Sequence, residues 1–385
     1  MNKQQEPRLR FKGFTGAWEY KKFENVLSIK SGMSQKEIEV SDGIYPILAT
    51  GGEIGRTNTA LYDKESVLIG RKGTIDKPYY MNTPFWTVDT LFYSELKNNI
   101  DGKFLYFLFQ CIEWRKLDTS TGVPSLTSTT IHEIQRYFPS KPEQTHLGLF
   151  FRRLDSQIAE SRAVLEKSRQ LKKAMLAKMF PANGEKIPKI RFKGFEGEWE
   201  RKTLGEVADI VRGASPRPIQ DPKWFDEKSD IGWLRIADVT AQNGRIHYLE
   251  QKISKAGQEN TRVLEEPHLL LSIAASVGKP VINYVKTGVH DGFLIFRNPD
   301  FELEFMYQYL DSFVESWQRY GQPGTQVNLN SDIVKNAEFF IPPTKSEQTQ
   351  IGNFFRQLDE TFALQSAEVE KLNQLKKGLL AAMLV

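Results

Sequence analysis

The sequence contains two motifs, each present twice and in the same order, and this internal repeat constrains the fold more than any other feature. The short motif reads PRLRFKGFTGAWE at residues 7–19 and PKIRFKGFEGEWE at residues 188–200, an offset of 181. The long motif occupies residues 143–180 and 347–384, an offset of 204, and its copies are identical at 20 of 38 positions. Such a repeat indicates a duplicated structural unit. We therefore expect two halves related by a pseudo-two-fold axis.

Both copies of the long motif are predicted to be helices. Their apolar residues recur close to a 3.6-residue period, and no proline interrupts either copy. At about 1.5 Å per residue each helix is about 57 Å long, more than a small core can cover. We expect the two helices to pack on each other as an antiparallel coiled coil. The predicted helix-pair core consists of Leu147, Phe151, Leu154, Ile158, Leu165 and Met175 with Ile351, Phe355, Leu358, Phe362, Val369 and Leu372.

Two dissimilar blocks lie between the repeated motifs and combine strand and helix patterns. Short apolar runs bounded by Gly and Pro indicate strands, and two longer stretches indicate helices. Asp89 and Asp291 correspond at an offset of 202, so most of the extra residues of the second half fall in the first part of its block. The predicted strands are 66–70, 90–93, 269–273 and 292–296, and the predicted helices are 103–116 and 305–319.

The predicted fold class is α+β, with two α/β domains joined by two long helices. The short motif opens each domain, and a long helix follows each domain. The expected division is a first domain at 1–138, a first long helix and linker at 139–187, a second domain at 188–342 and a second long helix at 343–385.

Composition excludes several classes of protein. Cys111 is the single cysteine, so an intrachain disulfide and a cysteine-based metal cluster are excluded. No run of 18 apolar residues occurs and the first residues lack an apolar segment, so we expect no membrane association and a cytoplasmic location. The net charge of +4 is concentrated in residues 139–200, which carry 13 basic and 8 acidic side chains. Nucleic-acid binding by the blocks would therefore depend on local basic clusters.

Motifs for catalysis are missing from the sequence. It contains neither a GxxxxGK[ST] phosphate-binding loop nor a DPPY or NPPF tetrapeptide of amino-methyltransferases, and its five histidines lack metal-ligand spacing. His290 and Asp291 have the composition of a catalytic cluster, but the corresponding residues in the first half are Val88 and Asp89. We therefore expect a non-enzymatic chain without a catalytic residue, metal or cofactor of its own.

The repeated motifs resemble those of the specificity subunit of Type I restriction–modification systems. The resemblance rests on the [KR][IL]RFKGFxGxWE motif, the EQxxIGxFFxxLD opening of the long helix and its QLKKxxLxxMF ending, and it covers the whole chain. It implies that each block is a target-recognition domain for one half of a split DNA sequence, with the helices as spacer. It also implies double-stranded DNA, two methyltransferase subunits and two restriction/translocase subunits as partners. S-adenosylmethionine, ATP and Mg²⁺ would belong to those partner subunits.

Because the two blocks differ, the expected target is asymmetric, with two short words separated by unread bases. The predicted DNA contacts lie in basic or polar turns. The corresponding pairs Thr74/Ser276 and Lys77/Lys279 suit phosphates, whereas Arg71 and Lys72 suit guanine, and the amides of Gln326 and Asn328 suit adenine. A solvated turn is the alternative for each of them. The candidates are Arg71, Lys72, Thr74 and Lys77 in the first block, and Arg212, Arg217, Arg235, Ser276, Lys279, Gln326 and Asn328 in the second.

A second function class stays open at this point. A duplicated scaffold that dimerises through its helices and binds proteins or glycans with its blocks would have the same repeat pattern. Salt-dependent binding to duplex DNA together with methyltransferase subunits separates the two hypotheses.

Overall fold

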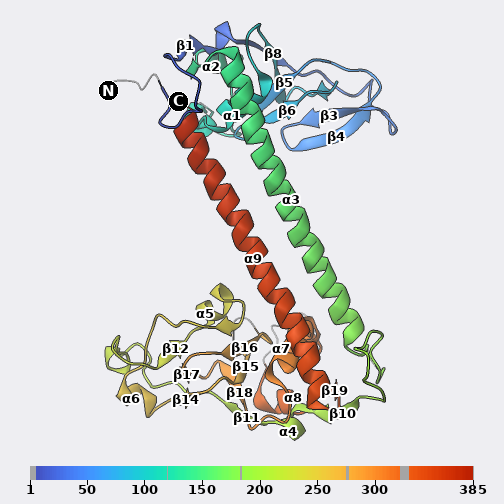
Figure 1. Ribbon diagram of the computed structural model, residues 1–385, viewed down its shortest axis with the longest axis vertical. Coiled ribbons are helices and arrows are strands. Elements are labelled where there is room, and N and C mark those ends of the chain that lie inside the picture. The colour runs from blue at the N-terminus through green and yellow to red at the C-terminus, as the bar shows by residue number, and fades with distance from the viewer. Residues whose placement is uncertain (1–5, 119, 183, 275–276, 321–328, 385) are drawn as a thin grey trace. The chain divides into compact units, whose positions relative to one another are not determined.

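The structure, a computed structural model, describes residues 6–118, 120–182, 184–274, 277–320 and 329–384. The chain forms two compact units (Figure 1). Unit 1 contains Met1–Val164 and Ser366–Val385, and unit 2 contains residues 165–365. Each unit therefore combines one block with segments of both long helices.

The block of unit 1 is built on two sheets. In the larger sheet the order is β2-β8-β5-β6 and all neighbours are antiparallel. In the smaller sheet the order is β4-β3-β7, and the β3–β4 hairpin extends from the rest of the block (Figure 1). The strands are β2 (Leu27–Ser31), β3 (Tyr45–Ala49), β4 (Gly52–Thr57), β5 (Ser66–Gly70), β6 (Tyr79–Met81), β7 (Trp86–Thr87) and β8 (Leu91–Leu96).

A two-stranded ribbon closes the block of unit 1 next to the long helix. It pairs β1 (Glu19–Lys22) with β9 (Gln135–Phe138). Helix α1 (Gly102–Gln110) begins at Asp101, whose side chain accepts a hydrogen bond from the Phe104 amide and caps the helix. The remaining helical elements are η1 (Phe23–Asn25), η2 (Trp114–Leu117) and α2 (Ser128–His132).

Unit 2 has the same three kinds of sheet, but its larger sheet has a fifth strand and a different strand lies at the centre of its smaller sheet. Its larger sheet has the order β11-β18-β15-β16-β13, its smaller sheet the order β12-β17-β14, and its ribbon pairs β10 with β19. The strands are β10 (Glu200–Thr203), β11 (Asp209–Arg212), β12 (Gly232–Leu234), β13 (Arg245–Ile246), β14 (Arg262–Leu264), β15 (Leu269–Ser272), β16 (Pro280–Asn283), β17 (Thr287–Val289), β18 (Phe293–Arg297) and β19 (Glu338–Ile341).

The helices of unit 2 show where the insertion lies. Within the described residues, α5, α6 and β13 have no counterpart in unit 1, and all three lie between β12 and β15. The predicted position of the extra residues, early in the second block, is therefore confirmed. The helical elements are α4 (Leu204–Val207), η3 (Pro222–Trp224), α5 (Ile236–Ala241), α6 (Lys255–Gln258), α7 (Leu303–Ser312), η4 (Val314–Tyr320) and α8 (Ser331–Lys335).

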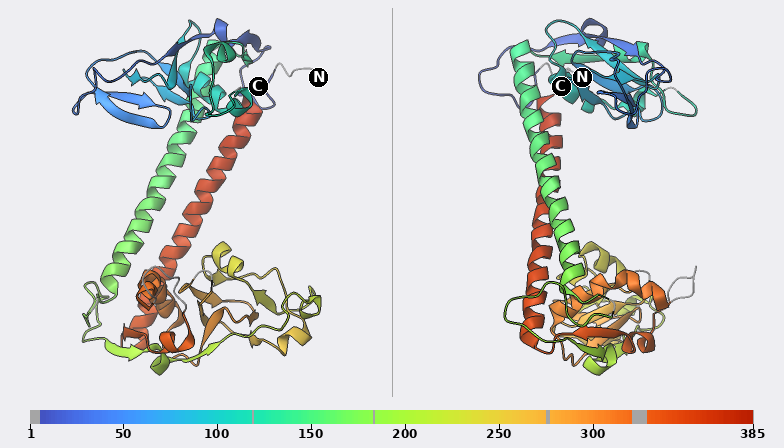
Figure 2. Two further views of the ribbon diagram at one scale, coloured as in Figure 1. Left: turned by 180° about the vertical axis from the view of Figure 1, so that it is seen from behind. Right: turned by 90° about the vertical axis from the view of Figure 1, so that its right-hand side faces the viewer.

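The predicted long helices are present as α3 (Lys141–Met179) and α9 (Lys345–Met383), each of 39 residues. In each unit, segments of the two helices lie side by side (Figures 1 and 2). In unit 1 the N-terminal part of α3 shares a core with the C-terminal part of α9, and in unit 2 the pairing is reversed. The helices are therefore antiparallel where they meet, as predicted.

The two helices exchange equivalent ion pairs. In unit 1, Nζ of Lys376 lies 2.6 Å from Oδ1 of Asp155. In unit 2, Nζ of Lys172 lies 2.6 Å from Oδ1 of Asp359. Lys172 and Lys376 occupy the same repeat position, as do the two aspartates, so each helix supplies an Asp near its start and a Lys near its end. The repeat thus gives each unit an equivalent ion pair between its two helix segments.

The predicted helix-pair core is buried to different degrees. The first turns of each helix are covered by the block of the same unit. In unit 1, for example, the rings of Phe151 on α3 and Phe107 on α1 lie 5.3 Å apart. Leu147, Phe151, Leu154, Ile158, Leu165, Ile351 and Phe355 are buried. The half-buried positions are Met175, Leu358, Phe362, Val369 and Leu372.

The short motif clamps the start of the long helix in both units. The Arg10 guanidinium donates two hydrogen bonds, of 2.7 and 2.8 Å, to the buried Glu143 carboxylate. Arg191 does the same to Glu347, at 2.6 and 2.8 Å. In both units the short motif and the start of the long helix are therefore joined by the same bidentate contact.

Candidate nucleic-acid interface

In unit 1 three loops meet at one edge of the larger sheet. The β5–β6 turn, residues 71–78, is held by its backbone, since the amides of Arg71 and Lys72 donate to the Thr90 carbonyl at 2.8 and 3.2 Å. The Gly73 amide donates to the Pro124 carbonyl at 2.8 Å, which joins the turn to the loop before α2. A scaffold of backbone hydrogen bonds thus presents side chains from distant segments together.

The side chains of this edge are mainly basic. The Arg71 guanidinium donates to the Asp89 carbonyl at 3.3 Å and lies 5.9 Å from the centre of the Phe92 ring. Lys72 and Lys77 are exposed, and Thr74 is half-buried. The structure therefore brings all four predicted residues of the first block to one turn.

In unit 2 two loops enclose Asp291, which is absent from the predicted contact residues. Its carboxylate accepts a hydrogen bond from the Ser215 hydroxyl at 2.8 Å and pairs with Arg217 at 2.5 Å. Its carbonyl accepts from Nε of Arg212 at 2.6 Å. Burial would raise the pKa of the Asp291 carboxyl, but the Ser215 hydrogen bond and the Arg217 charge outweigh it and hold the pKa below its ordinary value. Arg217 is therefore held on an ionised carboxylate, and Arg212 on the backbone of the same residue.

His290 supports the turn that contains Asp291. Its Nδ1 accepts a hydrogen bond from the Gly292 amide at 2.8 Å. Burial lowers the pKa of the imidazole, with Asp291 opposing the shift, so the ring is neutral near pH 7 and free to accept. The histidine has a structural role.

Arg235 lies at the same edge of unit 2. Strands β12 and β17 pair in parallel with Leu234 opposite Val289, so Arg235 and His290 leave the sheet side by side. The Arg235 guanidinium is held by Asp238 at 2.9 and 3.1 Å and approaches Glu250 at 3.5 Å. This arginine is thus oriented by two carboxylates within its own segment.

The other predicted residues of the second block are placed as follows. Lys279 is exposed immediately before β16, and its carbonyl accepts a hydrogen bond from the Ser272 amide at 2.9 Å. Ser276, Gln326 and Asn328 lie outside the described residues.

One glycine in each unit, Gly32 or Gly213, lets two loops approach closely at this edge. Neither glycine is among the residues predicted from the sequence. A Cβ on Gly32 would lie 2.1 Å from the Val88 carbonyl oxygen, and one on Gly213 would lie 2.1 Å from the His290 carbonyl oxygen. Only glycine permits this approach of two loops. The available signal was the pair GMSQK at 32–36 and GASPR at 213–217, which keeps the offset of 181.

Comparison with known proteins identifies the family. The sequence profile described as "Type I restriction modification DNA specificity domain" matches residues 16–167 and 196–375. The chain belongs to this family. The specificity subunit of the Type I restriction enzyme EcoprrI from Escherichia coli is 26% identical over 183 residues, 44% of each chain, so the alignment spans less than half of that relative.

Solved structures from Type I restriction–modification systems share the fold of this chain. The S subunit of a Type I restriction–modification system from M. genitalium matches with a TM-score of 0.69 and 16% identity, over 99% of both chains. A second structure, concerned with complex assembly and conformational transition of the type I R-M system, matches with a TM-score of 0.56 and 14% identity, over 96% of this chain and 97% of the other. The predicted family and fold class are confirmed.

The described residues contain no group of three or more His, Cys, Asp or Glu side chains arranged to hold a metal ion. No helix within the described part is long and apolar enough to cross a membrane.

Proposed function

We propose that this chain is the non-catalytic DNA-specificity subunit of a Type I restriction–modification complex, which reads a bipartite, asymmetric target. The observation that carries the proposal is the repetition of one edge with different side chains. In both units a glycine-containing loop, the turn before β8 or β18 and the turn after β5 or β15 meet there. The residues they present differ, Arg71 and Lys72 in unit 1 but Arg212 and Arg217 in unit 2, so each unit reads its own word.

The division of labour follows from the chemistry of these side chains. The exposed Lys77 neutralises phosphates without regard to sequence. Arg71, Arg212 and Arg217 are held by backbone or carboxylate contacts and present guanidinium groups, which recognise guanine by two parallel hydrogen bonds.

The proposed partners supply the catalysis. Two methyltransferase subunits would bind S-adenosylmethionine, and two restriction/translocase subunits would use ATP and Mg²⁺. The family membership and a fold shared with a Type I R-M assembly support these partners. We place the complex in the cytoplasm with its DNA substrate.

The test is methylome sequencing of a host that expresses the cognate methyltransferase subunit with or without this chain. We expect a methylated motif of two words and an unread spacer only when the chain is present. Incubation of the purified chain with S-adenosylmethionine or Mg²⁺ is expected to leave DNA unmodified and intact. A methylome that does not depend on the chain, or activity of the chain alone, would overturn the proposal.

Exchange of one block is expected to change one word. If residues 20–138 are replaced by the corresponding block of a related protein, the first edge is replaced while the clamps and long helices stay. The methylated motif should keep one of its words and gain a new one. A change in both words would contradict the assignment of one word to each unit.

Single substitutions at the edge of unit 1 are expected to separate phosphate from base contacts. Lys77→Ala should weaken binding to all duplexes and reduce the log–log salt slope by about 1, whereas Arg71→Ala should cost about 1–3 kcal/mol and relax one base position. Electrophoretic mobility shifts over a salt series measure both. Lys22→Ala, in an exposed ion pair on β1, is the control and should leave binding unchanged. Equal salt slopes for wild type and Lys77→Ala would refute the phosphate role.

A further inference from the structure

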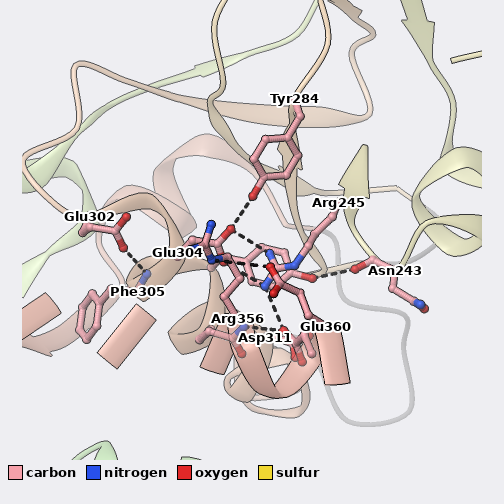
Figure 3. A network of polar contacts seen from close by, with 12 residues as sticks. Asn243, Arg245, Tyr284, Glu302, Glu304, Phe305, Asp311, Arg356 and Glu360 are labelled. Carbon is pink, nitrogen blue, oxygen red and sulfur yellow. Dashed lines mark hydrogen bonds and ion pairs between the residues drawn. The ribbon is translucent and has the colours of Figure 1, made fainter. Parts of the chain in front are cut away.

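A buried ionic network joins the inserted strand of unit 2 to its helices. Nη2 of Arg245, on β13, lies 2.9 Å from Oε2 of Glu304 on α7 and 2.9 Å from Oδ2 of Asp359 on α9. Figure 3 shows Arg245 and Tyr284 converging on Glu304 from different segments. Only 15% of the Arg245 side chain is exposed, against 10% for Glu304 and 21% for Asp359. One arginine therefore links three elements away from solvent.

Asp359 is the point where this network reaches both long helices. Its other oxygen pairs with Lys172 of α3 at 2.6 Å, and its Oδ2 also accepts from Gln308 of α7 at 2.6 Å. The Arg245 guanidinium lies 4.2 Å from the centre of the Tyr307 ring, within reach of a cation–π contact.

Unit 1 has a different connection at the equivalent place. Asp155 occupies the repeat position of Asp359 and pairs with Lys376 at 2.6 Å, but β13 has no counterpart among the described residues of unit 1. There the sheet contributes Tyr80, which lies 5.6 Å below the Arg152 guanidinium of α3. The ionic link through Arg245 is thus an addition of the insertion in unit 2.

Arg245 anchors β13 strongly because its charge is buried between carboxylates. Strand β13 has two residues and, among the described strands, pairs with β16 alone, so hydrogen bonds of the sheet hold it weakly. Burial would lower the pKa of Arg245, but the carboxylates of Glu304 and Asp359 outweigh burial and raise it, so the guanidinium stays charged. Without the Arg245 guanidinium, the carboxylates of Glu304 and Asp359 would stay buried with one positive charge fewer beside them, which would destabilise the folded state.

The anchored segment begins at the recognition edge. Arg235 follows β12 at that edge, α5 comes next, and β13 ends the segment at residue 246. The Tyr307 hydroxyl holds the turn between α5 and β13 by donating to the Asn243 carbonyl at 2.7 Å. The segment 235–246 is therefore fixed at its C-terminal end. Its N-terminal end, at Arg235, lies at the recognition edge.

We propose that Arg245 is a positioning residue that fixes the segment 235–246 to α7 and α9 and thereby orients the second recognition surface. The proposal rests on the proposed DNA-specificity function. It assigns to the network a role in reading the second word only, since unit 1 uses a different connection.

The test uses the chain assembled with methyltransferase subunits and a duplex carrying the motif that the methylome defines. Affinity is measured for this duplex and for duplexes with one base pair changed in either word. Arg245→Met keeps the apolar stem but removes the charge. It should reduce discrimination at the second word about ten-fold, because base contacts require side chains held to within about 0.5 Å, and should leave the first word unchanged. Arg245→Lys keeps the charge and should restore part of the discrimination.

Controls make the outcome specific to positioning. Lys286→Met removes an exposed ion pair with Asp230 in the same unit and should leave both words unchanged. General destabilisation by Arg245→Met would lower the active fraction and affect both words equally. This result would overturn the proposal, and so would unchanged discrimination at both words. If Arg245→Met does not fold, Arg245→Lys carries the test through its smaller loss at the second word.

A second measurement separates this proposal from the proposed function. Amide hydrogen exchange of the full chain without DNA should be about ten-fold faster over residues 235–246 in Arg245→Met, with β5 unchanged, because a lost anchor lowers the local opening free energy. Faster exchange together with absence of motif-dependent binding by the wild type would refute DNA specificity but retain the anchor. Unchanged exchange in 235–246 would refute the anchor.

Discussion

Replacing Arg191 with Met is expected to lower the free energy of unfolding by about 3–5 kcal/mol, because it leaves a buried carboxylate without its counter-charge. Glu347 is only 1% exposed, and Arg191 supplies two hydrogen bonds of 2.6 and 2.8 Å to it. The same guanidinium also donates to the Gly197 carbonyl at 2.6 Å, so its loss releases the short motif as well as the start of α9. Urea denaturation followed by circular dichroism measures the change.

Two further variants distinguish the buried charge from a general effect of arginine. Arg201→Met removes an ion pair with Glu338 that is exposed to solvent, and should cost less than about 1 kcal/mol. The double variant Arg191→Met with Glu347→Leu removes both charges and should recover most of the lost stability. If Arg201→Met cost as much as Arg191→Met, the clamp would not be a dominant contact of unit 2.

Proline at position 369 should lower the free energy of unfolding by about 3 kcal/mol or more and reduce assembly with the methyltransferase subunits. Proline removes one helical hydrogen bond and clashes with the preceding turn. Val369 lies inside α9, and its carbonyl accepts a 2.6 Å hydrogen bond from the Asn373 side chain. Asn373 in turn accepts from Arg162 of α3 at 3.0 Å, so the break also reaches the neighbouring helix.

The control for this substitution is Val369→Ala, which keeps the helix and removes two methyl groups from a half-buried position. Its effect should stay near 1 kcal/mol, in the range of ordinary substitutions. Denaturation curves and co-purification with the methyltransferase subunits measure both variants. A proline variant as stable as the alanine variant would show that α9 tolerates a break between its two ends.

The repeat was sufficient to predict the large-scale organisation because its signals are local or periodic. The long helices follow from a 3.6-residue apolar period without internal proline, and their observed bounds differ from the predicted ones by no more than two residues. The strand at 66–70 has the predicted bounds, because an apolar run between turns is also a local signal. The position of the insertion follows from offsets alone.

Tertiary structure decided which distant residues meet. The bidentate clamp of Arg10 on Glu143 joins residues 133 positions apart, and the repeat indicated only that both motifs matter. Asp291 brings Arg212 and Arg217 together through contacts across 74–79 positions, where sequence spacing carries no signal. The burial of Arg245 was equally hidden, because a charged residue on a two-residue strand reads as solvent-exposed until α7 and α9 pack against it. Local pattern thus determined the elements and their duplication, whereas the candidate recognition edges and the buried ionic contacts depend on packing between segments far apart in the chain.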